Sequence, residues 1–151
     1  MKKIIILMLF VITSCGYQPL YKANKGVSDL KIQNVELLGD VKISKEILSS
    51  LPIVLVNNDK TLNSLNIDSD VRIIEVSKNS KGQVTSYRTT LTVKLKVLDS
   101  KNNIIDEKIS QREFSYNTDQ NKFKLKEYQS KIQKNLIKSI IEDIIIYLNY
   151  S

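Results

Sequence analysis

The chain contains no histidine and only one cysteine among its 151 residues. It therefore lacks the commonest general base and metal ligand, and it cannot form a catalytic triad built on imidazole. A single cysteine cannot close an intramolecular disulfide. With only four glycines and no Walker or GxGxxG pattern, the sequence also gives no phosphate-binding loop. Because its acidic residues are scattered or sit in surface-like pairs, we expect no enzyme, no metal and no cofactor.

The charge is unbalanced toward lysine. The chain has 23 basic and 16 acidic residues, a formal net charge of +7. Without Lys2 and Lys3, which belong to the leader described next, the balance is 21 − 16 = +5. Two interpretations stay open: codon choice in an AT-rich genome, or an anionic partner such as nucleic acid, an anionic membrane or a phosphorylated glycolipid.

The first fifteen residues have the pattern of a secretory leader. Lys2 and Lys3 precede an apolar run, Ile4 to Ile12, that is too short to cross a bilayer of about 30 Å. The run ends in Ile12-Thr13-Ser14-Cys15, which resembles a bacterial lipobox. We predict a signal peptide at 1–14 that is removed and a lipid on Cys15, since several acyl chains anchor firmly. The domain would then lie outside the cytoplasm, which excludes nucleic acid as partner.

Residue patterns divide the remaining chain into a lipidated N-terminus and tether at 15–28 and one domain at 29–151. Residues 30–38 alternate as a strand. A short helix follows, with Ser44 as its N-cap, and Pro52 discourages its continuation. Residues 53–68 are ambiguous: the first four look like a strand and the rest like a loop.

Three further strands and a helix complete the domain. We expect strands at 70–77, 84–99 and 104–116, joined by turns, with a wet, basic face on the second strand. The apolar parity slips along the third strand, which predicts a β-bulge between Ile109 and Phe114. A helix is expected over 119–149, capped by Asn117 or Thr118. The predicted fold is α+β: a two-layer sandwich in which a mostly antiparallel four-stranded sheet packs against a short helix and a long C-terminal helix.

Three stretches carry a family resemblance. The start "CGYQPLY", the strand "KGQVTSYRTTLTVKLKVLD" continuing to "REFSYN", and the helix "LKEYQSKIQKNLIKSIIEDI" resemble the LptE family of lipopolysaccharide-assembly lipoproteins. The resemblance implies an outer-membrane lipoprotein, anchored on the periplasmic side, that plugs the LptD β-barrel and binds lipopolysaccharide. It also implies no catalysis and no cofactor. Gly16 after the cysteine favours the outer membrane; retention in the inner membrane stays open.

The same resemblance implies basic residues near the turn before the long strand and near the start of the last helix. Those regions hold the lipopolysaccharide-binding candidates Lys78, Lys81, Arg88, Lys122 and Lys124. Ammonium groups there could replace the divalent ions that bridge lipid A phosphates. The alternative function is a free-standing periplasmic lipoprotein that binds an anionic lipid or glycan, which predicts a deep apolar pocket between helix and sheet.

Overall fold

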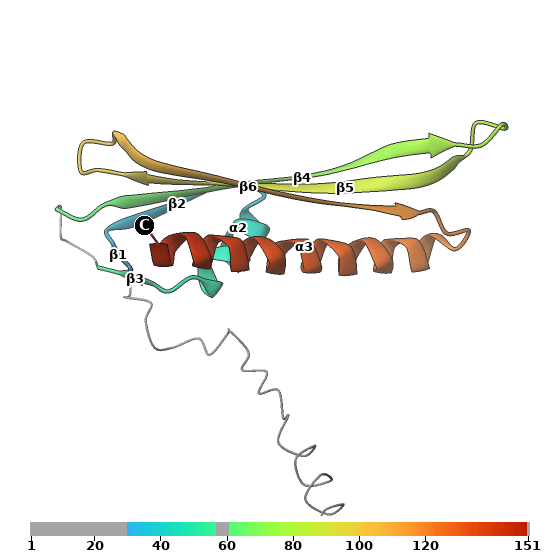
Figure 1. Ribbon diagram of the computed structural model, residues 1–151. Helices are drawn as coiled ribbons and strands as arrows, with labels where there is room; N and C mark the ends of the chain where they lie inside the picture. Colours follow the sequence, from blue (N-terminus) through green and yellow to red (C-terminus); the bar gives the residue numbers. More distant parts are fainter. Residues whose placement is uncertain (1–29, 57–60, 151) are drawn as a thin grey trace, which may run out of the picture.

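The computed structural model describes residues 30–56 and 61–150 as two layers, a twisted sheet and a pair of helices on one of its faces (Figure 1). The predicted signal peptide at 1–14, the predicted tether at 15–28 and Cys15 lie outside these residues. In chain order the elements are β1 (Leu30–Ile32), β2 (Asn34–Gly39), α2 (Val41–Ser50), β3 (Ile53–Leu55), β4 (Ser64–Lys78), β5 (Val84–Leu98), β6 (Ile104–Asn117) and α3 (Lys122–Tyr150).

The main sheet has four strands in the order β2-β4-β5-β6. Strands β4, β5 and β6 are antiparallel neighbours joined by tight turns, whereas β2 pairs with β4 in parallel. A second, two-stranded sheet joins β1 to β3, also in parallel. The predicted α+β sandwich with its mostly antiparallel four-stranded sheet is therefore confirmed.

The parallel pair requires a crossover, and α2 lies within it. The chain turns sharply at Gly39, whose φ is +67°, and a Cβ at this position would lie only 2.0 Å from the backbone oxygen of Ser69. Asp40 then caps α2, its Oδ1 accepting from the N–H groups of Lys42 and Ile43. The structure thus corrects the predicted cap at Ser44, a residue that lies inside the helix.

Ser44 has a different role because it is fully buried. Its hydroxyl lies within hydrogen-bond distance of the hydroxyl of Ser69, at 2.8 Å, and of the carbonyl of Leu38, at 3.0 Å. Ser69 in turn donates to the carbonyl of Asp40 at 2.9 Å. These bonds satisfy both buried hydroxyls and fasten α2 to the corner between β2 and β4.

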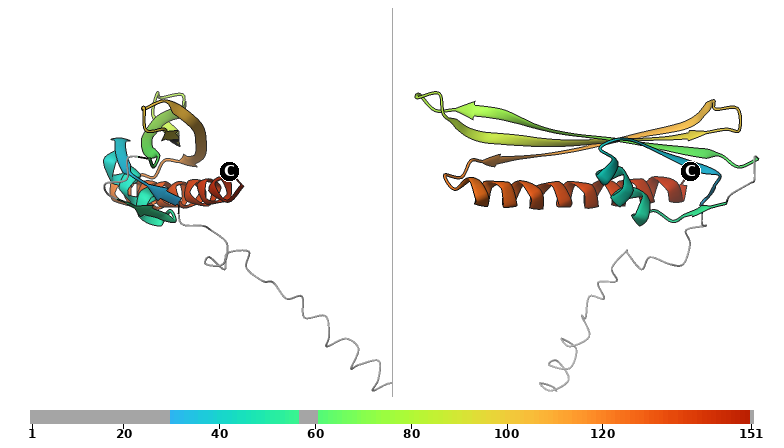
Figure 2. Two further views of the ribbon diagram at one scale, coloured as in Figure 1. Left: turned by 90° about the vertical axis from the view of Figure 1, so that its left-hand side faces the viewer. Right: turned by 180° about the vertical axis from the view of Figure 1, so that it is seen from behind.

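The long helix α3 runs beneath most of the length of the sheet (Figures 1 and 2). Its apolar stripe packs on the inward-facing side chains of β5 and β6, whereas α2 lies against β2 and β4. At the centre of the core between the helices and the sheet, several apolar side chains have no exposed surface. The apolar residues with no exposure there are Ile47, Leu65, Ile67, Leu91, Val93, Ile140 and Ile144.

Two predicted boundaries and one predicted irregularity are wrong. Strand β4 begins at Ser64, inside the ambiguous segment, because Leu65 and Ile67 alternate with polar residues that face outward. Helix α3 begins at Lys122, and its cap is Asn121, whose Oδ1 accepts from the first turn of the helix. Strand β6 pairs with β5 without a bulge near Ile109; the register shifts instead between Val97 and Leu98. The isoleucines that break the parity are simply exposed.

Candidate functional site

The β4–β5 turn and the start of α3 lie at the same end of the elongated molecule, which we call the distal end (Figures 1 and 2). The turn, residues 79–82, projects beyond the helix. Asn79 organises it: its Oδ1 accepts from the N–H groups of Lys81 and Gln83, at 2.9 and 3.0 Å. Gly82 supplies the positive φ of 76° that the turn needs.

The structure brings four of the five predicted binding residues to this end, all of them exposed lysines. Lys78 ends β4, with its Nζ 3.0 Å from Glu75, and Lys81 lies in the turn. Lys122 and Lys124 lie in the first turn of α3, which contains no acidic residue. We call these four residues the distal lysines. Because a helix N-terminus is itself positive, their charges add to it and make this end attractive to anions.

Arg88 is placed differently from the distal lysines. It lies within β5, where its Nη1 is 3.6 Å from Oε1 of Glu113 and its Nε donates to Ser115 Oγ at 3.1 Å. Both partners are on the neighbouring strand β6. Arg88 therefore links two strands, and a ligand would have to compete with Glu113 for its guanidinium.

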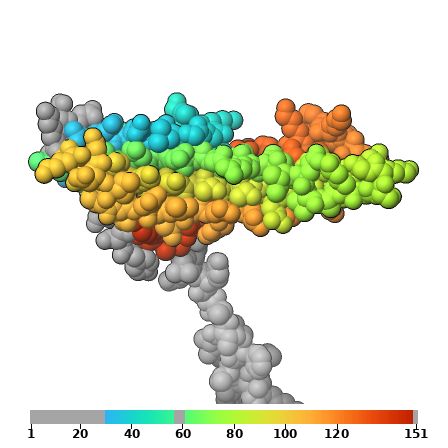
Figure 3. Space-filling view, turned by 90° about the horizontal axis from the view of Figure 1, so that it is seen from above, coloured from blue at the N-terminus to red at the C-terminus, as the bar shows by residue number. Residues whose placement is uncertain are grey.

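The face of the sheet that carries Arg88 is covered by no described helix (Figure 3). It was expected to be basic, but acidic residues on the neighbouring strands oppose its cations. Lys94 lies in register with Asp68 on β4, and Lys96 lies in register with Glu107 on β6. The unbalanced positive charge is instead carried by α3, whose exposed lysines are Lys122, Lys124, Lys126, Lys131, Lys134 and Lys138.

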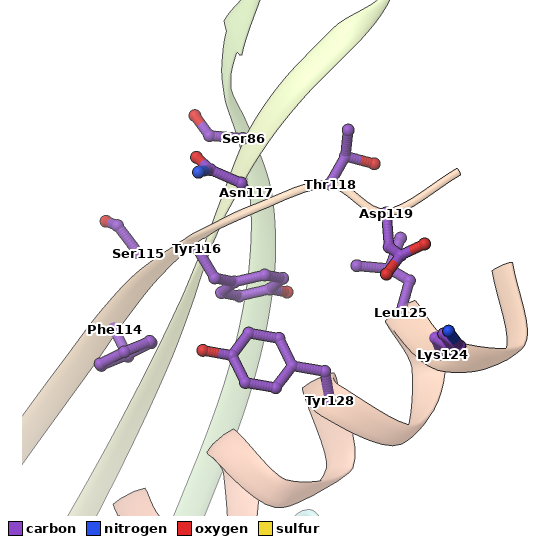
Figure 4. Close-up of a pocket in the computed structure, with 10 residues that line it drawn as sticks. All are labelled: Ser86, Phe114, Ser115, Tyr116, Asn117, Thr118, Asp119, Lys124, Leu125 and Tyr128. Atoms are coloured by element: carbon purple, nitrogen blue, oxygen red, sulfur yellow. The ribbon is translucent and has the colours of Figure 1, made fainter. Parts of the chain in front are cut away.

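A cleft of about 580 Å³ lies at the distal end, where β6 leaves the sheet and α3 begins (Figure 4). Its aromatic lining residues are Phe114, Tyr116 and Tyr128, and Tyr87 packs behind Tyr116. Tyr87 and Tyr116 stack with centroids 5.9 Å apart, and Tyr128 of α3 meets Tyr116 edge to face at 5.8 Å. The hydroxyls of Tyr116 and Thr89 are 3.2 Å apart, which satisfies both buried groups.

Sequence reasoning did not find this cleft, although it placed each aromatic residue on the correct face. Phe114 and Tyr116 share one parity of β6, and Tyr128 belongs to the apolar stripe of α3. Their meeting depends on the angle at which α3 crosses the end of β6, which no local pattern encodes. The distal lysine Lys124 also lines the cleft.

Among the residues that the structure describes, no helix is long and apolar enough to cross a membrane. Within residues 30–56 and 61–150, no group of three or more cysteine, aspartate or glutamate side chains could hold a metal ion.

The fold is that of a small α+β domain also found in solved bacterial lipoproteins. Rare lipoprotein B from Shewanella oneidensis matches with a TM-score of 0.57 at 12% identity, over 76% of this chain and 92% of that one. A minor lipoprotein from Acinetobacter baumannii matches with a TM-score of 0.61 at 20% identity, over 82% and 93%. At these identities the likeness concerns the fold. Comparison with curated protein sequences gives no significant match.

The family model named LptE, lipopolysaccharide-assembly, matches residues 27–148. Because this match covers most of the chain, the protein belongs to the LptE family. Family membership gives the protein a role in lipopolysaccharide assembly and places it in a family of lipoproteins.

Proposed function

We propose that the protein is an outer-membrane lipoprotein, lipidated at Cys15 and anchored on the periplasmic side, that occupies the lumen of the LptD barrel. There it binds lipopolysaccharide at the last stage of transport to the cell surface. The observation that carries this proposal is the family match over residues 27–148, joined to the gathering of lysines at one end of the fold.

The polar face of the sheet supports a position inside a hydrated barrel. Apart from a few aliphatic residues, that face presents charged and hydroxyl side chains from β4, β5 and β6, and their opposite charges lie in register. Removing such charges from water would cost free energy that only ion pairs of excellent geometry repay. A long two-layer body with one such face fits a wide, water-filled lumen.

The distal lysines supply the chemistry that lipid A phosphates require. Four exposed ammonium groups at the start of α3 and at the hairpin turn can bind several phosphate oxygens as point charges. Arg88 and Lys78 contribute less than the others, because Glu113 and Glu75 already pair with them. The alternative of a free-standing carrier needs a deep apolar pocket between helix and sheet. Side chains such as Ile140 and Leu91, neither of them exposed, fill that space instead.

Depletion of the protein tests the proposed role directly. We expect lipopolysaccharide to disappear from the cell surface and a tagged copy to recover a large outer-membrane barrel. Normal surface lipopolysaccharide after depletion, or recovery of no barrel, would refute it. A Cys15→Ala variant should stay as an unprocessed precursor in the inner membrane; normal cleavage and outer-membrane location would contradict lipidation at that residue.

Replacing all four distal lysines by glutamine tests the ligand site. Each substitution removes an ion pair worth about 0.2–1 kcal/mol at an exposed site, so the four together, about 0.8–4 kcal/mol, should lower affinity for lipopolysaccharide roughly 4- to 900-fold. Barrel recovery should change little.

A matched control replaces four exposed lysines elsewhere, Lys45, Lys101, Lys134 and Lys138, by glutamine. Net charge falls equally in both variants, so equal losses of affinity would mean that general charge, rather than the distal end, attracts the ligand.

A further inference from the structure

The cleft at the end of β6 combines flat aromatic surfaces with hydrogen-bonding groups. Phe114 and Tyr128 are each 46% exposed, so each ring keeps a free face, whereas Tyr116 is only 5% exposed and forms the floor. Six of the ten lining residues are polar, among them Asn117, Asp119 and Lys124. Figure 4 shows the aromatic rings on one side of the β6 ribbon and Ser115 and Asn117 on the other.

The open edge of β6 adds backbone groups to this cleft. Thr118 N–H donates to the carbonyl of Thr85 at 2.9 Å, which fixes which residues of β6 bond to β5. Because the pattern alternates in antiparallel strands, the N–H and C=O groups of Ser115 and Asn117 point away from β5. In the described part of the chain β6 is the last strand of the sheet, so these groups lie at its free edge.

We propose that this cleft is a binding subsite for a pyranose sugar ring. One face of such a ring presents polarised C–H groups, which are attracted to the negative face of an aromatic ring. Its rim presents hydroxyls, which both donate and accept hydrogen bonds and so match the edge backbone groups of Ser115 and Asn117 and the side chains of Asp119 and Lys124. The volume of about 580 Å³ lies within the usual range for small-ligand sites.

An acyl chain fits this cleft poorly. It would cover the six polar residues without offering them a hydrogen bond, and burying such groups unpaired is costly. The sugar subsite rests on the proposed function and assigns two parts of the ligand to two places. The distal lysines bind its phosphates, and the cleft binds one of its sugar rings. The sugar could come from the saccharide part of lipopolysaccharide or from peptidoglycan.

Titration of the purified protein with defined glycans tests the subsite. The probes are the delipidated core oligosaccharide of lipopolysaccharide, a peptidoglycan disaccharide fragment and intact lipopolysaccharide, with affinity from calorimetry and contacts from backbone amide shifts. We expect the core oligosaccharide to bind and to shift the amides of Ser115 and Asn117. If only the peptidoglycan fragment binds, the cleft is still a sugar subsite, but its sugar comes from peptidoglycan.

Three variants separate ring stacking from general effects. Tyr128→Ala and Phe114→Ala should each weaken oligosaccharide binding about 3- to 10-fold, the usual scale of one aromatic contact, while Tyr128→Phe should change it less than about twofold. Phe123→Ala is the matched control, because Phe123 is 77% exposed near the start of α3 but does not line the cleft. Circular dichroism checks that each variant folds; Phe114 is exposed enough that its loss leaves the core intact.

The outcomes separate this proposal from the function on which it rests. If intact lipopolysaccharide binds but neither glycan does, or if the two alanine variants bind the oligosaccharide as tightly as Phe123→Ala, the sugar subsite is refuted and the proposed function stands. If the oligosaccharide binds but intact lipopolysaccharide does not, the subsite stands and the proposed function fails. Binding of none of the probes refutes both.

Discussion

Asp143 is the residue whose replacement most directly tests how α3 is held on β6. Its Oδ2 accepts from the buried hydroxyl of Ser110 at 2.5 Å. Two cations of β6 lie near the same carboxylate: Arg112 Nη2 is 3.5 Å from Oδ1 and Lys108 Nζ is 3.9 Å from Oδ2. The inward face of β6 is therefore joined to α3 by charge around Asp143, in addition to the contact of Tyr116 with Tyr128.

Replacing Asp143 by asparagine keeps the shape of the side chain and removes its charge. A hydrogen bond to a charged acceptor is worth about 1.5–3 kcal/mol, and to a neutral one about 0.5–1.5, so this bond loses roughly 1 kcal/mol. The two ion pairs have side chains 27–41% exposed, and screening limits each of them to about 0.2–1 kcal/mol. We expect Asp143→Asn to lower the free energy of unfolding by about 1–3 kcal/mol.

Urea denaturation followed by circular dichroism measures this change, since urea leaves ion pairs unscreened. The matched control is Glu142→Gln, a neighbouring carboxylate on α3 for which the described residues provide no ion pair or hydrogen bond. In 1 M NaCl the loss should shrink toward the hydrogen-bond part alone. A loss below about 0.3 kcal/mol, or one equal to that of Glu142→Gln, would refute the charged clamp.

Three other predictions concern the fold. Gly39→Ala should lower the free energy of unfolding by roughly 2–4 kcal/mol, because its Cβ would lie 2.0 Å from a backbone oxygen; a loss under about 1 kcal/mol in urea denaturation would contradict this. Ile140→Ala should lower the free energy of unfolding by about 2–5 kcal/mol in the same assay, because truncating a side chain with no exposed surface leaves a cavity. Ile146→Ala, at an exposed position, should lower it by less than about 1 kcal/mol. Hydrogen bonds from the side chain and then the backbone of Asn103 lower the pKa of Asp99. These bonds therefore stabilise the turn fully at pH values above the ordinary pKa of about 3.9, and the contribution is lost as the pH falls through the lowered pKa. An NMR titration of Asp99 showing a midpoint at or above the ordinary value would contradict it.

Periodicity was enough to predict the architecture because its elements are long and strongly patterned. Leu91, Val93 and Leu95 alternate with polar residues over one continuous strand, and all three are buried as expected. The apolar stripe of α3 is likewise buried as expected, because the burial of apolar side chains is the main force that holds a helix of this length on a sheet. Local signals failed at the boundaries, where Asp40 and Asn121 cap the helices in place of Ser44, Asn117 or Thr118.

The candidate site was only partly predictable. The sequence placed Lys78 and Lys81 at a turn and Lys122 and Lys124 at a helix start, and the topology brings both groups to one end of the molecule. The same reasoning predicted a basic sheet face, because it could not know which acidic residues lie in register with Lys94 and Lys96. Register is set by turn geometry and by cross-strand packing along the whole hairpin.

By itself the sequence determined the class of fold, the leader pattern that ends in Cys15, and the choice of which face of each element is apolar, since all three follow from local spacing. Only the tertiary structure decided the rest: the parallel pairing of β2 with β4, the clamp on Asp143 and the aromatic cleft at the end of β6. Each depends on residues far apart in the chain meeting at one point. Such meetings are governed by crossing angles and strand register, which only the packed core fixes.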